Sequence, residues 1–208
     1  AKDRYGKTAL MYGPSEVLIK AGADVNAKDN FGRTALMYGP SEVLIKAGAK
    51  VNAKDNFGRT ALMYGPDSEV LINAGADINA KDNEGMTPLM HACMGSDIGI
   101  YRVLYPDIVK PLIKAGANIN EVDKDGDSAL LYAIYIYVGV AFYWGWDEPE
   151  LDNDTLPTFE TIKLLINNGA NVNIRNKEGK TPLSLSKGYP ELNKLLRDSG
   201  AYLQWKWL

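Results

Sequence analysis

The stretch KDNFGRTALMYGPSEVLIKAGAKVNA, residues 28–53, decides the fold because nearly the same string stands on both sides of it. Residues 54–80 repeat it with one added residue, Asp67, and a few exchanges. Near-identical tandem units indicate a chain that buries its apolar surface by stacking one copy on the next. Residues 2–27 match the stretch except at four positions, with Arg4, Tyr5, Lys7 and Asp24 in place of Asn30, Phe31, Arg33 and Lys50.

The phrase recurs in looser form over the rest of the chain. Each copy opens on Asp/Asn-x-x-Gly-x-Thr/Ser and closes on Gly-Ala. The repetition predicts a single domain over residues 1–203, followed by a tail at 204–208. The predicted units are residues 2–27, 28–53, 54–80, 81–121, 122–174 and 175–203.

Each part of the unit can be explained by the backbone preferences of its residues. The Asp-x-x-Gly step is turn chemistry, because Asp bonds its own backbone and Gly accepts a positive φ. Thr suits the N-cap of a first helix, and Pro88 and Pro182 suit the first helical position. Gly48 fits the position just after a second helix. We therefore predict a turn and two antiparallel helices in each unit. The glycines equivalent to Gly48 are Gly22, Gly75, Gly116, Gly169 and Gly200.

The Gly-x-Thr-Ala/Pro-Leu openings and the Gly-Ala-Asp/Asn-Val/Ile-Asn closings resemble the ankyrin repeat family from about residue 2 to about residue 203. The resemblance implies an all-α repeat solenoid of ankyrin-type helix–turn–helix units linked by short β-hairpin or turn fingers. It also implies a scaffold or adaptor that binds a partner protein through the fingertips and the concave face of the first helices, without catalysis.

The unit lengths depart from the family length of about 33 residues. The first three units are shorter, because Gly-Pro at 13–14, 39–40 and 65–66 is expected to end the first helix after about one turn. Such a helix stacks little surface, so we expect the N-terminal half to be the less stable one. Units four and five are longer, with insertions around 95–106 and 139–157. Insertions of this kind usually form loops, which often carry function.

The resemblance places the partner contacts at the fingertips. An aromatic ring beside Arg in the first three units is typical of interaction hot spots. The alternative is that each ring packs on the next finger. The predicted partner-binding residues are Arg4, Tyr5, Lys7, Asn30, Phe31, Arg33, Asn56, Phe57, Arg59, Asn83, Glu84 and Met86, with Tyr132, Tyr135, Trp144 and Trp146 of unit five as a second contact. Lys124, Asp127, Lys177, Glu178 and Lys180 occupy the matching fingertip positions of units five and six.

Residues 129–146 contain no charge, and this length invites a transmembrane interpretation. Acidic residues stand on both sides, however, and no basic flank orients the segment. We therefore favour a long first helix packed between neighbouring units. Its tyrosines at 132, 135 and 143 share one side of that helix, either as core residues or as an aromatic strip for a partner. Trp205 and Trp207 either cap the last helix pair or form a docking peptide.

No motif predicts a cofactor, a metal or a reaction. The run 123–127 begins like a calcium loop, but its twelfth position is Ile134, where the pattern needs Glu. For the acidic cluster at 147–154 we favour a solvated loop over a calcium site. His91 and Cys93 stand two apart, as a nucleophile pair could, but we interpret Cys93 as a small buried residue.

The totals narrow the class of protein further. The net charge is −3 without a basic block, so nucleic acid is not predicted as a partner. The single cysteine allows no internal disulfide, which suits a reducing, cytoplasmic location and a chain expected to be monomeric. Two alternatives remain. A consensus-like or engineered array without a natural ligand fits the near-identity of units one to three, although the irregular insertions oppose it. An enzyme or a membrane protein built around unit five is the other.

Overall fold

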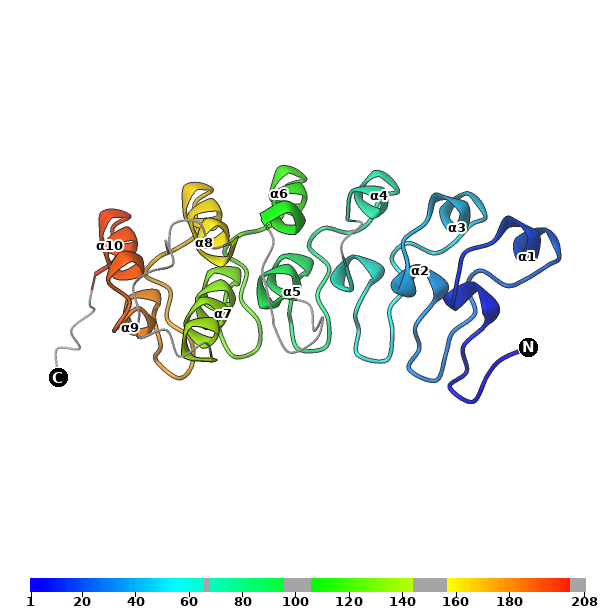
Figure 1. Cartoon of the computed structure of the whole chain (residues 1–208), viewed down its shortest axis with the longest axis horizontal. Coiled ribbons are helices and arrows are strands. Elements are labelled where there is room, and N and C mark those ends of the chain that lie inside the picture. Colours follow the sequence, from blue (N-terminus) through cyan, green and yellow to red (C-terminus); the bar gives the residue numbers. More distant parts are fainter. Residues whose placement is uncertain (66–67, 96–105, 144–156, 203–208) are drawn as a thin grey trace.

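The computed structural model describes residues 1–65, 68–95, 106–143 and 157–202. They form one elongated array of helices, in which each unit contributes a first helix to one row and a second helix to another (Figure 1). Turns line one long edge of the array, a row of first helices lies above them, and a row of second helices forms the opposite edge.

The helices fall into two rows. The first helices are η1 (Ala9–Met11), α2 (Ala35–Tyr38), η2 (Ala61–Met63), α5 (Pro88–Met94), α7 (Ala129–Tyr143) and α9 (Pro182–Leu185). The second helices are α1 (Glu16–Lys20), α3 (Glu42–Lys46), α4 (Ser68–Asn73), α6 (Pro106–Lys114), α8 (Pro157–Asn167) and α10 (Pro190–Asp198). The described residues contain no strand, so the prediction of an all-α repeat solenoid is confirmed and the fingers seen there are turns, not β-hairpins.

The predicted threonine cap forms at Thr87 and Thr181, whereas Thr8, Thr34 and Thr60 stand at the N-cap position without a side-chain cap bond. Thr87 is the N-cap of α5 and its side chain accepts a hydrogen bond from the Met90 backbone N–H, while Pro88 occupies the first turn. At the other end of a unit, Gly48 has a φ of +87° just after α3. This left-handed conformation reverses the chain after the helix without a Cβ clash.

The first helices differ greatly in length. η1, α2 and η2 contain three, four and three residues, whereas α7 contains fifteen. The expected early termination is confirmed: α2 ends at Tyr38, directly before Gly39 and Pro40. Proline removes a backbone donor and restricts the preceding residue, so the helix cannot continue through it.

A continuous apolar core runs between the two rows. It includes Leu36, Leu44 and Leu71 in the first units, and Cys93 in α5. Tyr137 of α7 is also buried in this core. The centroid of its ring lies 5.6 Å from that of Phe159 and 5.7 Å from that of Tyr189. The long apolar segment therefore forms α7, which packs on α5, α8 and α9. In the described parts of the chain, no helix is long and apolar enough to cross a bilayer.

Candidate partner-binding surface at the fingers

Each unit begins with a turn that we call a finger: residues 2–7, 28–33, 54–59, 81–86, 122–127 and 175–180. In the second finger the Asp29 carboxylate holds the turn together. Its Oδ1 accepts the backbone N–H groups of Phe31 and Arg33 at 2.9 and 2.8 Å. Backbone bonds from Asp29 N–H to the Arg33 carbonyl and from Gly32 N–H to the Asp29 carbonyl close the loop. This Asx-turn chemistry is what the sequence predicts.

The other oxygen of Asp29 binds side chains. Asp29 Oδ2 accepts Arg33 Nε–H at 3.0 Å and the Tyr38 hydroxyl at 2.6 Å, and the carboxylate is fully buried. Burial alone would raise the pKa of Asp29, but the bonds from Tyr38, from the two backbone N–H groups and from Arg33 outweigh it and lower that pKa. Burial and the bond to Asp29 raise the pKa of Tyr38 to about 12.

Arg33 is held in one pose by two rings. Its guanidinium carbon lies 4.6 Å from the Phe31 ring centroid and 4.8 Å from that of Tyr38. The third finger repeats the arrangement: Arg59 lies 4.6 and 4.7 Å from Phe57 and Tyr64, and it pairs with the buried Asp55. Cation–π contacts and a buried carboxylate therefore preorganise both guanidinium groups before any partner arrives.

The first finger is a variant of the same design. Lys7 replaces the arginine, and its Nζ lies 5.3 Å from the Tyr12 ring centroid and 4.4 Å from that of Tyr38 in the next unit. Arg4 stacks on Tyr5 at 4.6 Å. The three finger rings remain partly open to solvent, with 46% of Tyr5, 45% of Phe31 and 52% of Phe57 exposed. Each ring contacts a cation of its own finger and still presents a free face.

The predicted asparagines connect neighbouring fingers. Asn30 donates its backbone N–H to the Tyr5 carbonyl at 3.0 Å and its Nδ2–H to the Arg4 carbonyl at 3.2 Å. Asn56 and Asn83 make the same pair of bonds to the fingers before them. The side chains of these three asparagines therefore hold neighbouring fingers together. They contribute to a partner surface by setting the distance between the fingers.

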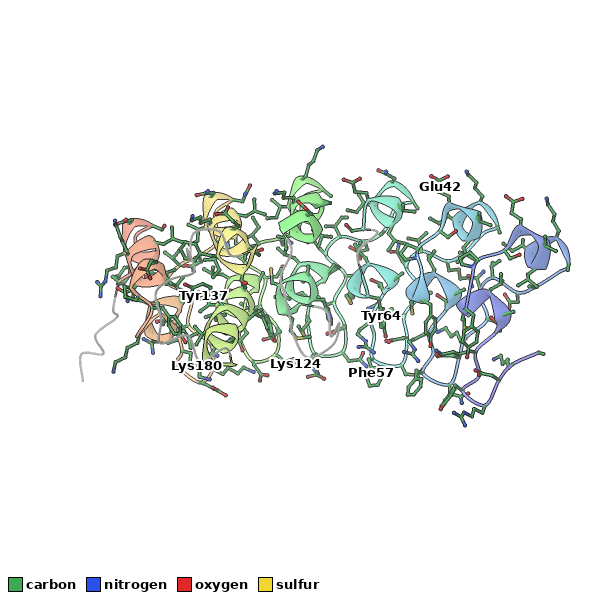
Figure 2. All side chains as sticks on the ribbon, viewed as in Figure 1. Glu42, Phe57, Tyr64, Lys124, Tyr137 and Lys180 are labelled. Carbon is green, nitrogen blue, oxygen red and sulfur yellow. The ribbon has the colours of Figure 1, made fainter. Side chains whose placement is uncertain are left out.

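The fourth and fifth fingers carry the opposite charge. Glu84 and Asp125 stand where the earlier fingers have an aromatic ring, and Asp127 stands where they have a cation. Met86 takes that cation position in the fourth finger, and the structure buries it in the core, so its prediction as a partner contact is corrected. Figure 2 shows Phe57, Lys124 and Lys180 along one edge of the array and Glu42 at the opposite edge.

The tyrosines of α7 have partners inside the chain. The Tyr132 hydroxyl donates to Asp123 Oδ2 at 2.5 Å, and the Tyr135 hydroxyl donates to Asp127 Oδ1 at 3.1 Å. Both side chains are half-buried, so their rings contribute to the packing of α7 on the fingers. Burial raises the pKa of Asp127, against the hydrogen bonds from Asn176 and Tyr135. Trp144 and Trp146, the other predicted contacts of this unit, lie outside the described residues.

His91 and Cys93 occupy different environments. His91 Nε2 lies 2.9 Å from Asp82 Oδ2, at the position that tyrosine takes in the first three units. Burial lowers the pKa of His91, against the opposing effect of Asp82. Cys93 is completely buried, and burial raises the pKa of its thiol. A nucleophilic cysteine needs the opposite, an accessible thiol with a lowered pKa. Within the described residues, no group of His, Cys, Asp and Glu is arranged to hold a metal ion.

Sequence reasoning missed the anchor of each finger. Five units pair an Asp with a hydrogen-bonding ring nine residues later, and this recurrence is visible in the sequence. The pairs are Asp3 with Tyr12, Asp29 with Tyr38, Asp55 with Tyr64, Asp82 with His91, and Asp123 with Tyr132. A spacing of nine residues, from a turn into the following helix, corresponds to no helix or strand period. The spacing alone therefore does not predict that the two residues are in contact.

Comparison with known proteins agrees with this architecture. Residues 67–135 match the family described as ankyrin repeats (3 copies). No curated protein matches the chain. Among solved structures, an ankyrin repeat domain from Acinetobacter baumannii AYE is similar, with 29% sequence identity and a TM-score of 0.68. The alignment covers 96% of this chain and 100% of that domain. The repeated fingers, the paired helices and these matches together show an ankyrin repeat fold, and the match to the family itself covers residues 67–135.

Proposed function

We propose that the chain is a binding module that recognises a partner protein through the fingers of its first three units. Ankyrin repeats are generally protein–protein interaction modules. The observation that carries the proposal is the row of exposed rings Tyr5, Phe31 and Phe57, two of them stacked with an arginine that a buried aspartate holds in place. Exposed, rigid aromatic and arginine side chains are the residues that dominate interaction energies.

The bonds between fingers support rigid recognition. Backbone N–H groups of Asn30, Asn56 and Asn83 bond the fingers before them, and Lys2, Lys28 and Lys54 each donate Nζ–H to a carbonyl of the following finger at 2.8 Å. A surface that is ordered before binding loses little conformational entropy when it binds. The same bonds repeat from unit to unit, so the rings are presented at a regular spacing.

The proposal is tested by affinity capture from a lysate of the organism that encodes the chain. The test variant is Phe31→Ala/Phe57→Ala, and the matched control is Tyr202→Ala, whose ring is 57% exposed but lies outside the fingers. We expect the intact chain and the control to retain the same protein and the test variant to lose it. Circular dichroism establishes that all three are folded.

The alternative is a consensus-like array without a natural ligand. It is favoured by the near-identity of residues 2–27 and 28–53. Failure of the intact chain to retain any protein above background would support this alternative. Retention of one protein equally by all three chains would place the contact on the face of the first helices or in unit five, and would overturn the proposal for the fingers.

A further inference from the structure

The charge of the fingers changes sign along the array. Fingers 2–7, 28–33 and 54–59 contain seven Lys and Arg residues and three Asp residues. Fingers 81–86 and 122–127 contain two Lys residues and five Asp and Glu residues. Because the units share one fold, this difference comes from exchanges at single finger positions, among them the exposed Arg4 and Glu84, and it leaves the framework unchanged. The array therefore presents a basic, aromatic surface beside an acidic one.

The arginines of the basic fingers retain donors for a partner. A guanidinium group has five N–H donors. In the described structure Asp29 engages Nε–H of Arg33, and Asp55 engages Nε–H of Arg59 with a further contact to Nη2. The flanking rings fix the plane of each guanidinium group. The Arg33 and Arg59 side chains are 24% and 30% exposed, and a guanidinium held in a fixed plane favours paired hydrogen bonds from its remaining N–H groups to a carboxylate.

From these observations we propose that fingers 2–7, 28–33 and 54–59 bind an extended acidic segment of the partner protein. The inference rests on the proposed function and specifies the chemistry of the partner. Carboxylates of the segment bind Lys7, Arg33 and Arg59, and its backbone or apolar side chains lie against the exposed rings. The acidic side chains of the next two fingers repel a continuation of the same segment, so Glu84 marks where the acidic stretch ends.

The spacing of the units sets the spacing of the carboxylates. η1 contacts α2, and α2 contacts η2, so successive fingers are separated by about the distance between packed helices. That distance is about 8–10 Å, and a chain in the extended polyproline II conformation advances about 3.1 Å per residue with three residues per turn, so every third side chain lies on the same face. A carboxylate at every third residue therefore meets successive fingers. A nucleic acid strand has no such limit, and its continuous phosphate chain would run onto Glu84 and Asp125.

The test measures binding of fluorescein-labelled dodecapeptides to the full chain by fluorescence anisotropy. The probe is (Glu-Ser-Ala) repeated four times, with (Gln-Ser-Ala) repeated four times as the uncharged control. A third peptide has the composition of the probe with its four Glu residues adjacent. We expect the probe to bind at least about tenfold more tightly than the uncharged peptide, and more tightly than the clustered one. Added salt weakens the binding.

Two matched double variants locate the site. Arg33→Gln/Arg59→Gln removes two charges from the fingers, and Lys20→Gln/Lys46→Gln removes two charges from α1 and α3, where both side chains are more than three-quarters exposed. We expect the finger variant to bind the probe about tenfold more weakly and the control to change binding less than about twofold. A conservative variant, Arg33→Lys/Arg59→Lys, distinguishes a loss of binding from a loss of folding. We expect it to fold, because Lys7 occupies the same position in the first unit, and to bind the probe with intermediate affinity.

A gain of function completes the test. Glu84→Phe/Met86→Arg turns the fourth finger, KDNEGM, into the KDNFGR of the second and third. We expect tighter binding of the probe, because a fourth finger can then engage its fourth carboxylate. Absence of saturable binding, equal binding of the Glu and Gln peptides, or tighter binding of an oligouridylate of matched length overturns the inference. If the Glu peptide does not bind while capture from lysate still depends on Phe31 and Phe57, the acidic segment is excluded and the proposed function stands.

Discussion

The Tyr38 hydroxyl donates a 2.6 Å hydrogen bond to the buried Asp29 carboxylate, which links the end of α2 to the finger that begins the same unit. Tyr12 makes the same bond to Asp3 at 2.6 Å, but both of these residues are exposed. The difference arises because the first unit has no described neighbour on its outer side, whereas the second is covered by the first. The same Tyr–Asp hydrogen bond is therefore exposed to solvent in the first unit and shielded from it in the second.

This pair predicts unequal costs for the same substitution. Tyr38→Phe removes a hydrogen bond to a buried carboxylate, and we expect it to lower the free energy of unfolding by about 2 kcal/mol. Tyr12→Phe removes the equivalent bond in contact with water, which replaces it, and we expect a clearly smaller loss. Urea denaturation of both variants and the parent measures the difference. Equal losses in the two variants would show that burial of Asp29 contributes nothing to the bond.

His91 predicts a dependence of stability on pH. Its pKa is lowered from the ordinary 6.5 in the folded chain, so the unfolded chain takes up the proton first as the pH falls. Stability that is complete above pH 6.5 is therefore lost as the pH falls through the folded-state pKa. The chain has a single histidine, so one imidazole resonance followed by NMR gives that pKa directly. A folded-state value at or above 6.5 would contradict the prediction.

His91→Tyr provides the matched control for this dependence. The variant places in the fourth unit the tyrosine that the first three units carry at this position. We expect the substitution to be compatible with the fold, because the introduced hydroxyl can donate to Asp82 as that of Tyr38 does to Asp29. The loss of stability as the pH falls below 6.5, measured by urea denaturation, should become smaller, and what remains reports the carboxylates.

A methyl group added at Gly32 should be damaging, as it should be at the equivalent Gly6 and Gly58. The φ of Gly32 is +78°, and a Cβ there would lie 2.4 Å from Asn56 Oδ1 and 2.9 Å from the Asn56 backbone nitrogen. Gly32→Ala therefore adds a clash to the cost of about 1–2 kcal/mol for a left-handed residue. Gly39→Ala meets no atom within 4 Å and has an extended φ of −165°, so it should leave stability nearly unchanged. Thermal denaturation of the two variants distinguishes the cases.

The lengths of the first helices predict a gradient of local stability. Helices α2 and η2 contain four and three residues, and each has little surface to stack. Helix α7 is longer and packs on three neighbouring helices. We expect the amides of α7 to exchange with deuterium most slowly, and those of η1 and α2 to exchange by opening reactions of lower free energy. Uniform protection across the array would show that the stack unfolds only as a whole.

The repeat, its turns and most of its helix ends could be predicted from local sequence. Gly48 and Thr87 act within a few residues of their own positions, so local chemistry is enough to predict what they do. The same is true of Pro40, which ends α2 without help from any distant residue. The resemblance to ankyrin repeats followed from the same local patterns, because their recurrence is itself a property of the sequence.

The roles of the fingertip side chains depend on contacts between units and could not be predicted from local sequence. Asn30 bonds the finger before it, Met86 is buried, and Arg33 lies between two rings above a buried carboxylate. Each of these outcomes depends on a neighbouring unit or on the path of the chain between finger and helix. Residues 2–27 and 28–53 are nearly identical, yet Tyr12 is exposed and Tyr38 is half-buried. Local sequence alone does not predict that difference, because the exposure of a side chain depends on what stacks against it.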